Sequence, residues 1–93
     1  MVREKEITSG PVPYRYHLDI LETLSRHGLA PTTDTPPPVV RRALSDLYRY
    51  EIRRLRDSLL AGRVEKAHYI DRVLDLRRKY WLLSVPVERW VHR

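Results

Sequence analysis

Two long stretches of the sequence repeat apolar residues at helical spacing, and only a short segment containing a glycine separates them. In the second stretch the apolar residues recur at alternating steps of four and three: Tyr69, Val73, Leu76, Tyr80 and Leu83. The first carries a similar stripe, formed by Val40, Leu44, Leu47, Tyr48, Ile52, Leu55 and Leu59. Such steps are typical of one face of an α-helix. Two helices with so short a link must pack antiparallel, so the sequence predicts a helical hairpin over residues 37–61 and 64–84.

The remainder of the chain predicts one further helix. Residues 13–28 have apolar side chains on one face and end at Gly28, a residue favoured just beyond helix C-termini. The opposite face carries a polar row at steps of four and three: Arg15, Asp19, Glu22 and Arg26. We expect an extended arm over residues 1–12, a linker over 29–36 and a tail over 85–93. The prediction is a single all-α domain, in which a shorter N-terminal helix packs against a long antiparallel hairpin.

Composition narrows the class of protein. The absence of cysteine excludes a disulfide framework, a thiolate nucleophile and a cysteine-ligated metal centre. No uncharged run approaches the roughly 20 residues of a membrane-spanning helix, and the charged N-terminus lacks the features of a signal peptide, so we expect a soluble, cytoplasmic protein. Asn and Gln are also absent, and Met occurs only at position 1. Heat-adapted organisms deplete these residues, which favours a thermophilic source; a GC-rich genome is the alternative explanation for the many arginines.

Two charged residues interrupt the apolar faces of the predicted hairpin. Glu51 lies on the stripe of the first hairpin helix, and Arg77 lies on that of the second. Folding the hairpin about its turn brings the two to within about half a helical turn of each other. We therefore predict a partly buried ion pair between Glu51 and Arg77 that fixes the register of the hairpin and adds little net stability.

The net charge of +6 belongs entirely to residues 41–79, which hold twelve basic and six acidic residues. Four arginines line one edge of the first hairpin helix over about 21 Å at the helical rise: Arg42, Arg49, Arg53 and Arg56. Such a row is a candidate face for an anion or for nucleic-acid phosphates. Several acids stand at ion-pair spacing from these arginines, Asp46 among them, so a merely solvated face is the favoured interpretation. An acidic protein partner is a third possibility.

The sequence offers little for catalysis or metal binding. Glu65 and His68 have the spacing used in carboxylate-bridged dimetal bundles, but such a site needs two copies of the motif and the chain has one. No serine lies in a nucleophile motif, and no glycine-rich phosphate loop is present. We therefore expect no enzymatic activity, no metal, no cofactor and no small-molecule substrate.

Apolar residues that the hairpin itself cannot cover say more about function than the candidate metal or catalytic residues do. Ile70, Leu74 and Trp81 lie to one side of the stripe that one hairpin partner can cover. Together with Trp90 of the tail they form a candidate association surface. Two hairpins that pair through it would build a four-helix core; a monomer closed by the N-terminal helix is the alternative. The leading prediction is a non-enzymatic protein-interaction module that forms a homodimer. The second is a sequence-tolerant nucleic-acid-binding protein that uses the arginine row.

Overall fold

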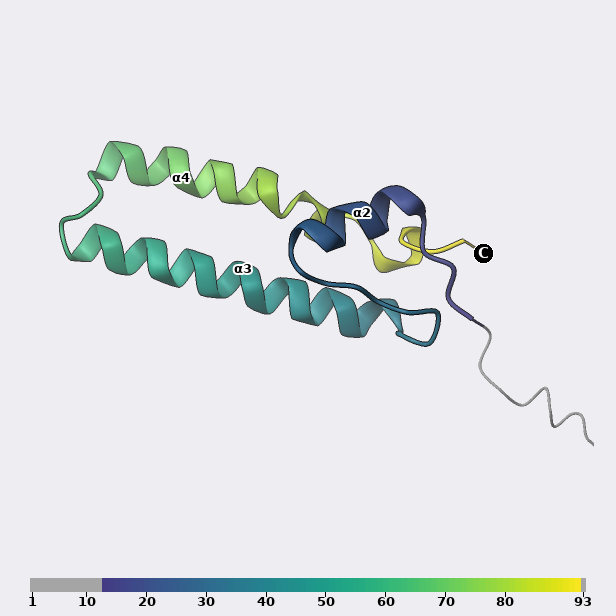
Figure 1. The fold of residues 1–93 in the computed structure, drawn as a ribbon. Coiled ribbons are helices and arrows are strands. Elements are labelled where there is room, and N and C mark those ends of the chain that lie inside the picture. The colour runs from purple at the N-terminus through teal and green to yellow at the C-terminus, as the bar shows by residue number, and fades with distance from the viewer. Residues whose placement is uncertain (1–12, 93) are drawn as a thin grey trace, which may run out of the picture.

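The computed structural model describes residues 13–92, which contain three α-helices: α2 (Leu18–Arg26), α3 (Pro37–Leu60) and α4 (Lys66–Lys79). Two short 3-10 helices follow, η1 (Trp81–Ser84) and η2 (Val87–Arg89). Within the described residues β-pairing is limited to one isolated antiparallel bridge between Tyr16 and Val91. The prediction of an all-α fold with three helices is confirmed (Figure 1). The arm predicted over residues 1–12 lies outside the described residues.

Helices α3 and α4 form the predicted antiparallel hairpin (Figure 1). The turn between them depends on Gly62, whose φ of 75° lies in the left-handed region that side chains disfavour. The amide of Gly62 donates to the carbonyl of Leu59 at 3.0 Å, and that of Arg63 donates to Ser58 at 2.9 Å. These two bonds are those of a Schellman motif, which satisfies the last carbonyls of α3 and reverses the chain.

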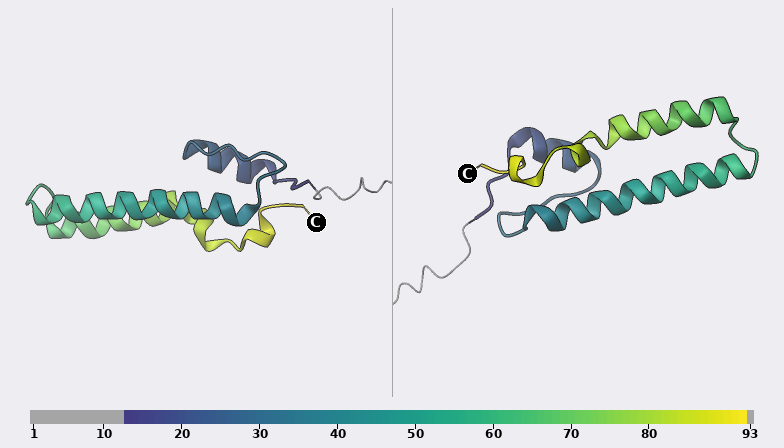
Figure 2. Two further views of the ribbon diagram at one scale, coloured as in Figure 1. Left: turned by 90° about the horizontal axis from the view of Figure 1, so that it is seen from below. Right: turned by 180° about the vertical axis from the view of Figure 1, so that it is seen from behind.

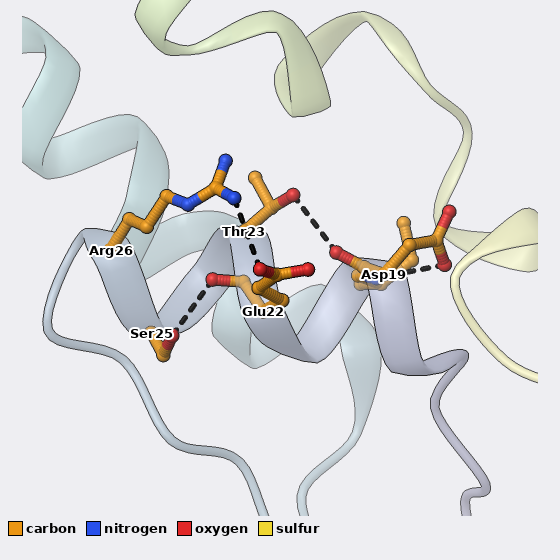
Figure 3. A network of polar contacts seen from close by, with 6 residues as sticks. Asp19, Glu22, Thr23, Ser25 and Arg26 are labelled. Atoms are coloured by element: carbon orange, nitrogen blue, oxygen red, sulfur yellow. Dashed lines mark hydrogen bonds and ion pairs between the residues drawn. The ribbon is translucent and has the colours of Figure 1, made fainter.

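Gly28 ends α2 in the same way, as the sequence predicts. Its φ is 77°, and the amides of Gly28 and Leu29 donate to Ser25 and Leu24, each at 3.0 Å. Thr23 is buried, and its hydroxyl donates to the carbonyl of Asp19 at 2.9 Å. This buried polar side chain therefore has a hydrogen-bond partner. The polar face of α2 carries a further side-chain pair between Arg26 and Glu22 at 3.1 Å (Figure 3).

The first helix starts later than predicted, because residues 14–17 are extended. The amide of Tyr14 donates to the carbonyl of Thr33 at 2.8 Å. Two bonds reach the tail: the amide of His17 donates to Trp90 at 3.1 Å, and that of His92 donates to Arg15 at 2.8 Å. The backbone N–H and C=O groups of this segment therefore form hydrogen bonds with distant parts of the chain. A helix before Leu18 would add no hydrogen bonds that these groups lack.

The last helix also ends earlier than predicted, at Lys79 instead of residue 84. Tyr80 leaves helical geometry with φ −104° and ψ 32°, and the chain continues as the tighter 3-10 turn η1. This change of direction leaves Leu82 fully buried and keeps Trp81 exposed. The 3-10 turn is favoured over a continued α-helix because it allows the whole side chain of Leu82 to be removed from water.

The hydrophobic core occupies only the base of the molecule, where α2, the first half of α3 and the tail meet. Its buried members also include residues just before α2, just after α4 and in η1; they are Tyr16, Ile20, Leu24, Val40, Leu44, Tyr80, Leu82 and Trp90. Figure 2 shows α2 on one side of the hairpin and the 3-10 turns on the other. Beyond the base, Leu55 is the one buried apolar residue among those that the structure describes. The far part of α3 and α4 is therefore a two-helix arm that projects from a packed base.

Candidate interaction surfaces

A polar cluster joins three helical segments where the arm meets the base. The Glu51 carboxylate, on α3, accepts hydrogen bonds from the hydroxyl of Tyr80 and from the Nζ of Lys79, the latter at 3.0 Å. His27, just after α2, lies against Tyr80 with ring centroids 4.5 Å apart. Its Nε2 donates to the carbonyl of Lys79 at 3.1 Å. The cluster thus ties the end of α2 to the end of α4 and to the middle of α3.

The predicted partner of Glu51 differs from the one in the structure. Arg77 is exposed and lies with Ile70 and Leu74, whereas Glu51 pairs with Lys79. Residues 77 and 79 are two positions apart, so they point about 200° apart around the helix, and only one of them can face α3. Counting residues from the turn predicts how far along the hairpin the partner of Glu51 lies. It does not predict which side of α4 a given residue faces. Glu51 thus forms an ion pair across the hairpin as expected, but with Lys79 instead of Arg77, and Tyr80 adds a hydrogen bond to it.

The protonation states of the cluster follow from its contacts. Burial raises the pKa of the Glu51 carboxyl, but the hydrogen bonds from Tyr80 and Lys79 outweigh it, so the net pKa lies below the ordinary value. Burial and then the neighbouring carboxylate raise the pKa of the Tyr80 hydroxyl. Burial lowers the pKa of His27, against the opposing effect of its bond to the Lys79 carbonyl. Glu51 is therefore an ionised acceptor at neutral pH, which suits a joint between helices better than a proton donor.

The four arginines of the predicted row lie exposed along α3, and two of them share a hollow. Arg42 and Arg49 line it together with Arg41, Ser45, Pro38 and Val87. Arg49 also pairs with Asp46 at 3.4 Å, although both side chains remain well exposed. Arg53 and Arg56 are exposed farther along the same edge, outside the hollow. Among the described residues that line the hollow none is acidic, so this lining is positively charged.

Arg41 has a role that the sequence does not reveal. Its guanidinium donates to the carbonyl of Leu83 at 2.8 Å, across a separation of 42 residues. The bond connects the first half of α3 to η1 and satisfies a carbonyl at the end of that turn. No local pattern in the sequence indicates a partner so far along the chain.

The predicted association surface divides into three parts. Ile70 and Leu74 are 55% and 42% exposed on α4, as expected of such a surface. Trp81 is 42% exposed but lines a separate hollow beside α2, with Thr23 and His27.

Trp90 does not belong to this surface, and the prediction for it is wrong. Its side chain is completely buried, and its indole N–H donates to the carbonyl of Val85 at 3.0 Å. The tail returns to the base and makes Trp90 part of the core. Periodicity cannot show this, since the tail has no helical pattern of its own.

Glu65, which precedes α4, and His68, in its first turn, are both exposed, with 3.7 Å between Oε1 and Nδ1. Across residues 13–92, the His, Asp and Glu side chains nowhere gather in the groups of three that could hold a metal ion. None of the helices described is long and apolar enough to cross a membrane.

A scan against protein-family models, a search of curated proteins and a search of solved structures each returned no match for this chain.

Proposed function

We propose that the protein is a non-enzymatic interaction module that self-associates through the outer face of α4. The observation that carries the proposal is that none of the 14 residues of α4 is buried. Helix α3 covers one side of α4, and the other side presents Ile70 and Leu74 to solvent beside the half-buried Tyr69 and Val73. Exposed apolar side chains that cluster on one helix face are typical of an association surface.

The energetics of the arm support the same proposal. A chain of 93 residues is near the size at which one core suffices, and here the core lies at one end. The arm has Leu55 as its one buried apolar side chain within the described residues, although α3 extends for about 36 Å. Helical stability in proteins comes chiefly from burial of an apolar face. A second copy packed on α4 would supply the burial that the arm lacks.

Light scattering after size exclusion, repeated over a wide range of concentrations, tests this proposal. We expect a dimer that dissociates on dilution and is weakened at least tenfold by the double substitution Ile70→Ser and Leu74→Ser. The matched control is Leu18→Ser with Val39→Ser, which also removes two exposed apolar side chains, 83% and 58% exposed, but from the base. A monomer at every concentration contradicts the proposal.

The hollow beside Arg42 favours a second function, sequence-tolerant binding of nucleic acid along the arginine row. The hollow gathers three guanidinium groups and the hydroxyl of Ser45, with no carboxylate among its lining residues. Arginine forks and hydroxyl groups are common donors to phosphate oxygens. The row continues past the hollow through Arg53 and Arg56, so an extended backbone could follow the edge of α3.

Binding to a fluorescent oligonucleotide at several salt concentrations distinguishes the two functions. We expect affinity at low salt to fall by about 0.9 log units per log unit of salt for each phosphate contacted. Alanine at the four row positions should remove binding. The control removes the same charge from four arginines outside α3: Arg15, Arg26, Arg78 and Arg89. Equal loss in both variants indicates a non-specific effect of net charge and contradicts a role for the row.

A further inference from the structure

The hollow beside Arg42 lies where the N-terminal part of α3 meets the 3-10 turn η2, and we call it the arginine hollow. Its volume is about 370 Å³. Ligand sites have volumes of about 300–1,000 Å³, so the arginine hollow is large enough to hold a small chemical group. Helix α3 and η2 both contribute to its lining, which consists of Pro38, Arg41, Arg42, Ser45, Arg49 and Val87.

The hydrogen-bond donors of the arginine hollow come from successive turns of one helix. Arg42, Ser45 and Arg49 stand at steps of three and four, so their side chains share a face of α3. Arg41 lies beside them and is already ordered, because its guanidinium donates to the Leu83 carbonyl at 2.8 Å. That bond uses one of the five N–H donors of a guanidinium and leaves the others for an anion. An anion in the hollow therefore meets one cation whose ordering costs no further entropy.

The positive charge of the arginine hollow is only weakly neutralised by the protein itself. Among the residues that the structure describes, no ion pair involves Arg41 or Arg42. Arg49 pairs with Asp46 at 3.4 Å, and the two side chains are 71% and 64% exposed. Charge-assisted hydrogen bonds of this kind are about 2.7–2.9 Å long, so Asp46 holds Arg49 weakly and leaves it open to a stronger anion.

The other basic hollow of the base, beside Trp81, lacks this property. Each of its arginine and lysine side chains is held by an acid: Arg26 by Glu22 at 3.1 Å, Arg78 by Asp75 at 2.9 Å and Lys79 by Glu51 at 3.0 Å. An anion in that hollow would have to displace a carboxylate for every cation that it gains. The arginine hollow is therefore the better anion site of the two.

The number of donors indicates the kind of phosphate. Three guanidinium groups and a hydroxyl line the arginine hollow, whereas Arg53 and Arg56 stand singly farther along α3. A phosphodiester within a nucleic-acid backbone carries a single charge. A phosphate monoester carries a charge of about −1.5 to −2 at pH 7 and has three acceptor oxygens. The arginine hollow therefore suits a monoester, and the rest of the row suits diesters.

The place of the arginine hollow along α3 agrees with a terminal phosphate. The helix begins at Pro37, and no basic residue of α3 precedes Arg41, so the row ends at the hollow. We propose that the arginine hollow binds the terminal phosphate monoester of a nucleic-acid strand whose backbone follows the arginine row. This inference rests on the proposed nucleic-acid binding and specifies which part of the strand the hollow takes.

Single-stranded oligonucleotides of one sequence, with a phosphate at the 5′ end, at the 3′ end or at neither end, test this assignment. Fluorescence anisotropy of a label on an internal base, at low salt, gives the three dissociation constants. We expect one of the phosphorylated strands to bind at least fivefold more tightly than the unphosphorylated strand, because the hollow adds charge-assisted hydrogen bonds that a diester does not make. Equal affinities for all three strands overturn the inference.

A matched pair of variants locates the preference. Arg42→Ala with Arg49→Ala removes two exposed arginines from the arginine hollow, and Arg53→Ala with Arg56→Ala removes two exposed arginines of the same row outside it. Both variants lose the same charge and gain a good helix former, so we expect both to fold, as circular dichroism can verify. The first should bind phosphorylated and unphosphorylated strands equally, and the second should bind both more weakly but keep the preference. A preference that survives in the first variant, or is lost from both, overturns the inference.

Inorganic phosphate distinguishes a strand end from a free anion. If it shifts the NMR amide signals of Ser45 and Arg49 while the three strands bind equally, the ligand is a free phosphate and the assignment to a strand end is overturned. Equal, salt-dependent binding of the three strands retains the proposed nucleic-acid function and removes the inference alone. No binding of any strand at low salt removes that function and the inference together.

Discussion

Replacing Trp90 by alanine removes the side chain that closes the base of the molecule. The side chain is completely buried and lies in the same cluster as Tyr16 and Leu82. A tryptophan buries about 150–250 Å², which at about 25 cal/mol per Å² corresponds to about 4–6 kcal/mol as an upper bound. Measured costs of such truncations are about 3–5 kcal/mol, and we expect that range here. The free energy of unfolding of a small domain is about 5–15 kcal/mol, so the substitution removes a large share of it.

The second tryptophan provides a control of the same residue type. Trp81 is 42% exposed, so Trp81→Ala should cost about 1 kcal/mol or less. Guanidinium unfolding of both variants, followed by circular dichroism at a concentration below that of self-association, measures the difference directly.

Fluorescence quenching by acrylamide adds a second readout. Trp90, observed alone in Trp81→Ala, should be protected, and Trp81, observed alone in Trp90→Ala, should be accessible. Equal costs for the two substitutions, or equal quenching, would refute the reasoning that the tail is held in the core by Trp90.

Three further predictions concern the joint between the helices, the hairpin turn and the composition. Because the folded pKa of Glu51 is lowered, its stabilising effect is present above the ordinary pKa of 4.5 and is lost as the pH falls through the folded value. Glu51→Gln should therefore cost about 1 kcal/mol at pH 7 in urea unfolding, and a cost that persists at pH 2 would contradict the role of the charge. Gly62→Ala should cost about 1 kcal/mol, because a Cβ strains a φ of 75°, whereas a loss below about 0.3 would mean that the turn adapts. Since the chain lacks Asn, Gln and Cys, heating should leave it chemically intact, and we expect calorimetric scans to repeat after cooling.

The hairpin could be predicted because its signals are local. Leu76 and Tyr80 mark a face through their spacing alone, and Gly62 marks the turn through its backbone freedom. The glycine at the end of α2 is found in the same way. Each of these features requires only residues within a few positions of one another.

The rest of the structure depends on contacts between distant segments, which spacing does not encode. Tyr16 lies in a helical pattern, yet its segment is extended because it pairs with the tail at Val91. Glu51 was recognised as a charge on an apolar face, but its partner depends on which side of α4 faces α3. A useful signal was present in Tyr80, because a buried tyrosine hydroxyl usually requires an acceptor and Glu51 was the nearest acid on the facing stripe.

Trp81 stands at helical spacing from Ile70 and Leu74, so its exposure follows from the same pattern. Trp90 lies in a tail without a helical pattern, and its burial depends on how the tail folds back onto the base.

The bridge between Tyr16 and Val91 has a consequence for the order of folding. It closes a loop that spans almost the whole described chain, and such a loop has a high entropic cost until the segments between its ends are themselves compact. The hairpin closes locally through Gly62, so we expect it to form first and to bring the tail near the N-terminal segment. The base then assembles last. A hydrogen-exchange pulse during refolding should therefore find the amides of His17 and His92 protected later than those in the middle of α3.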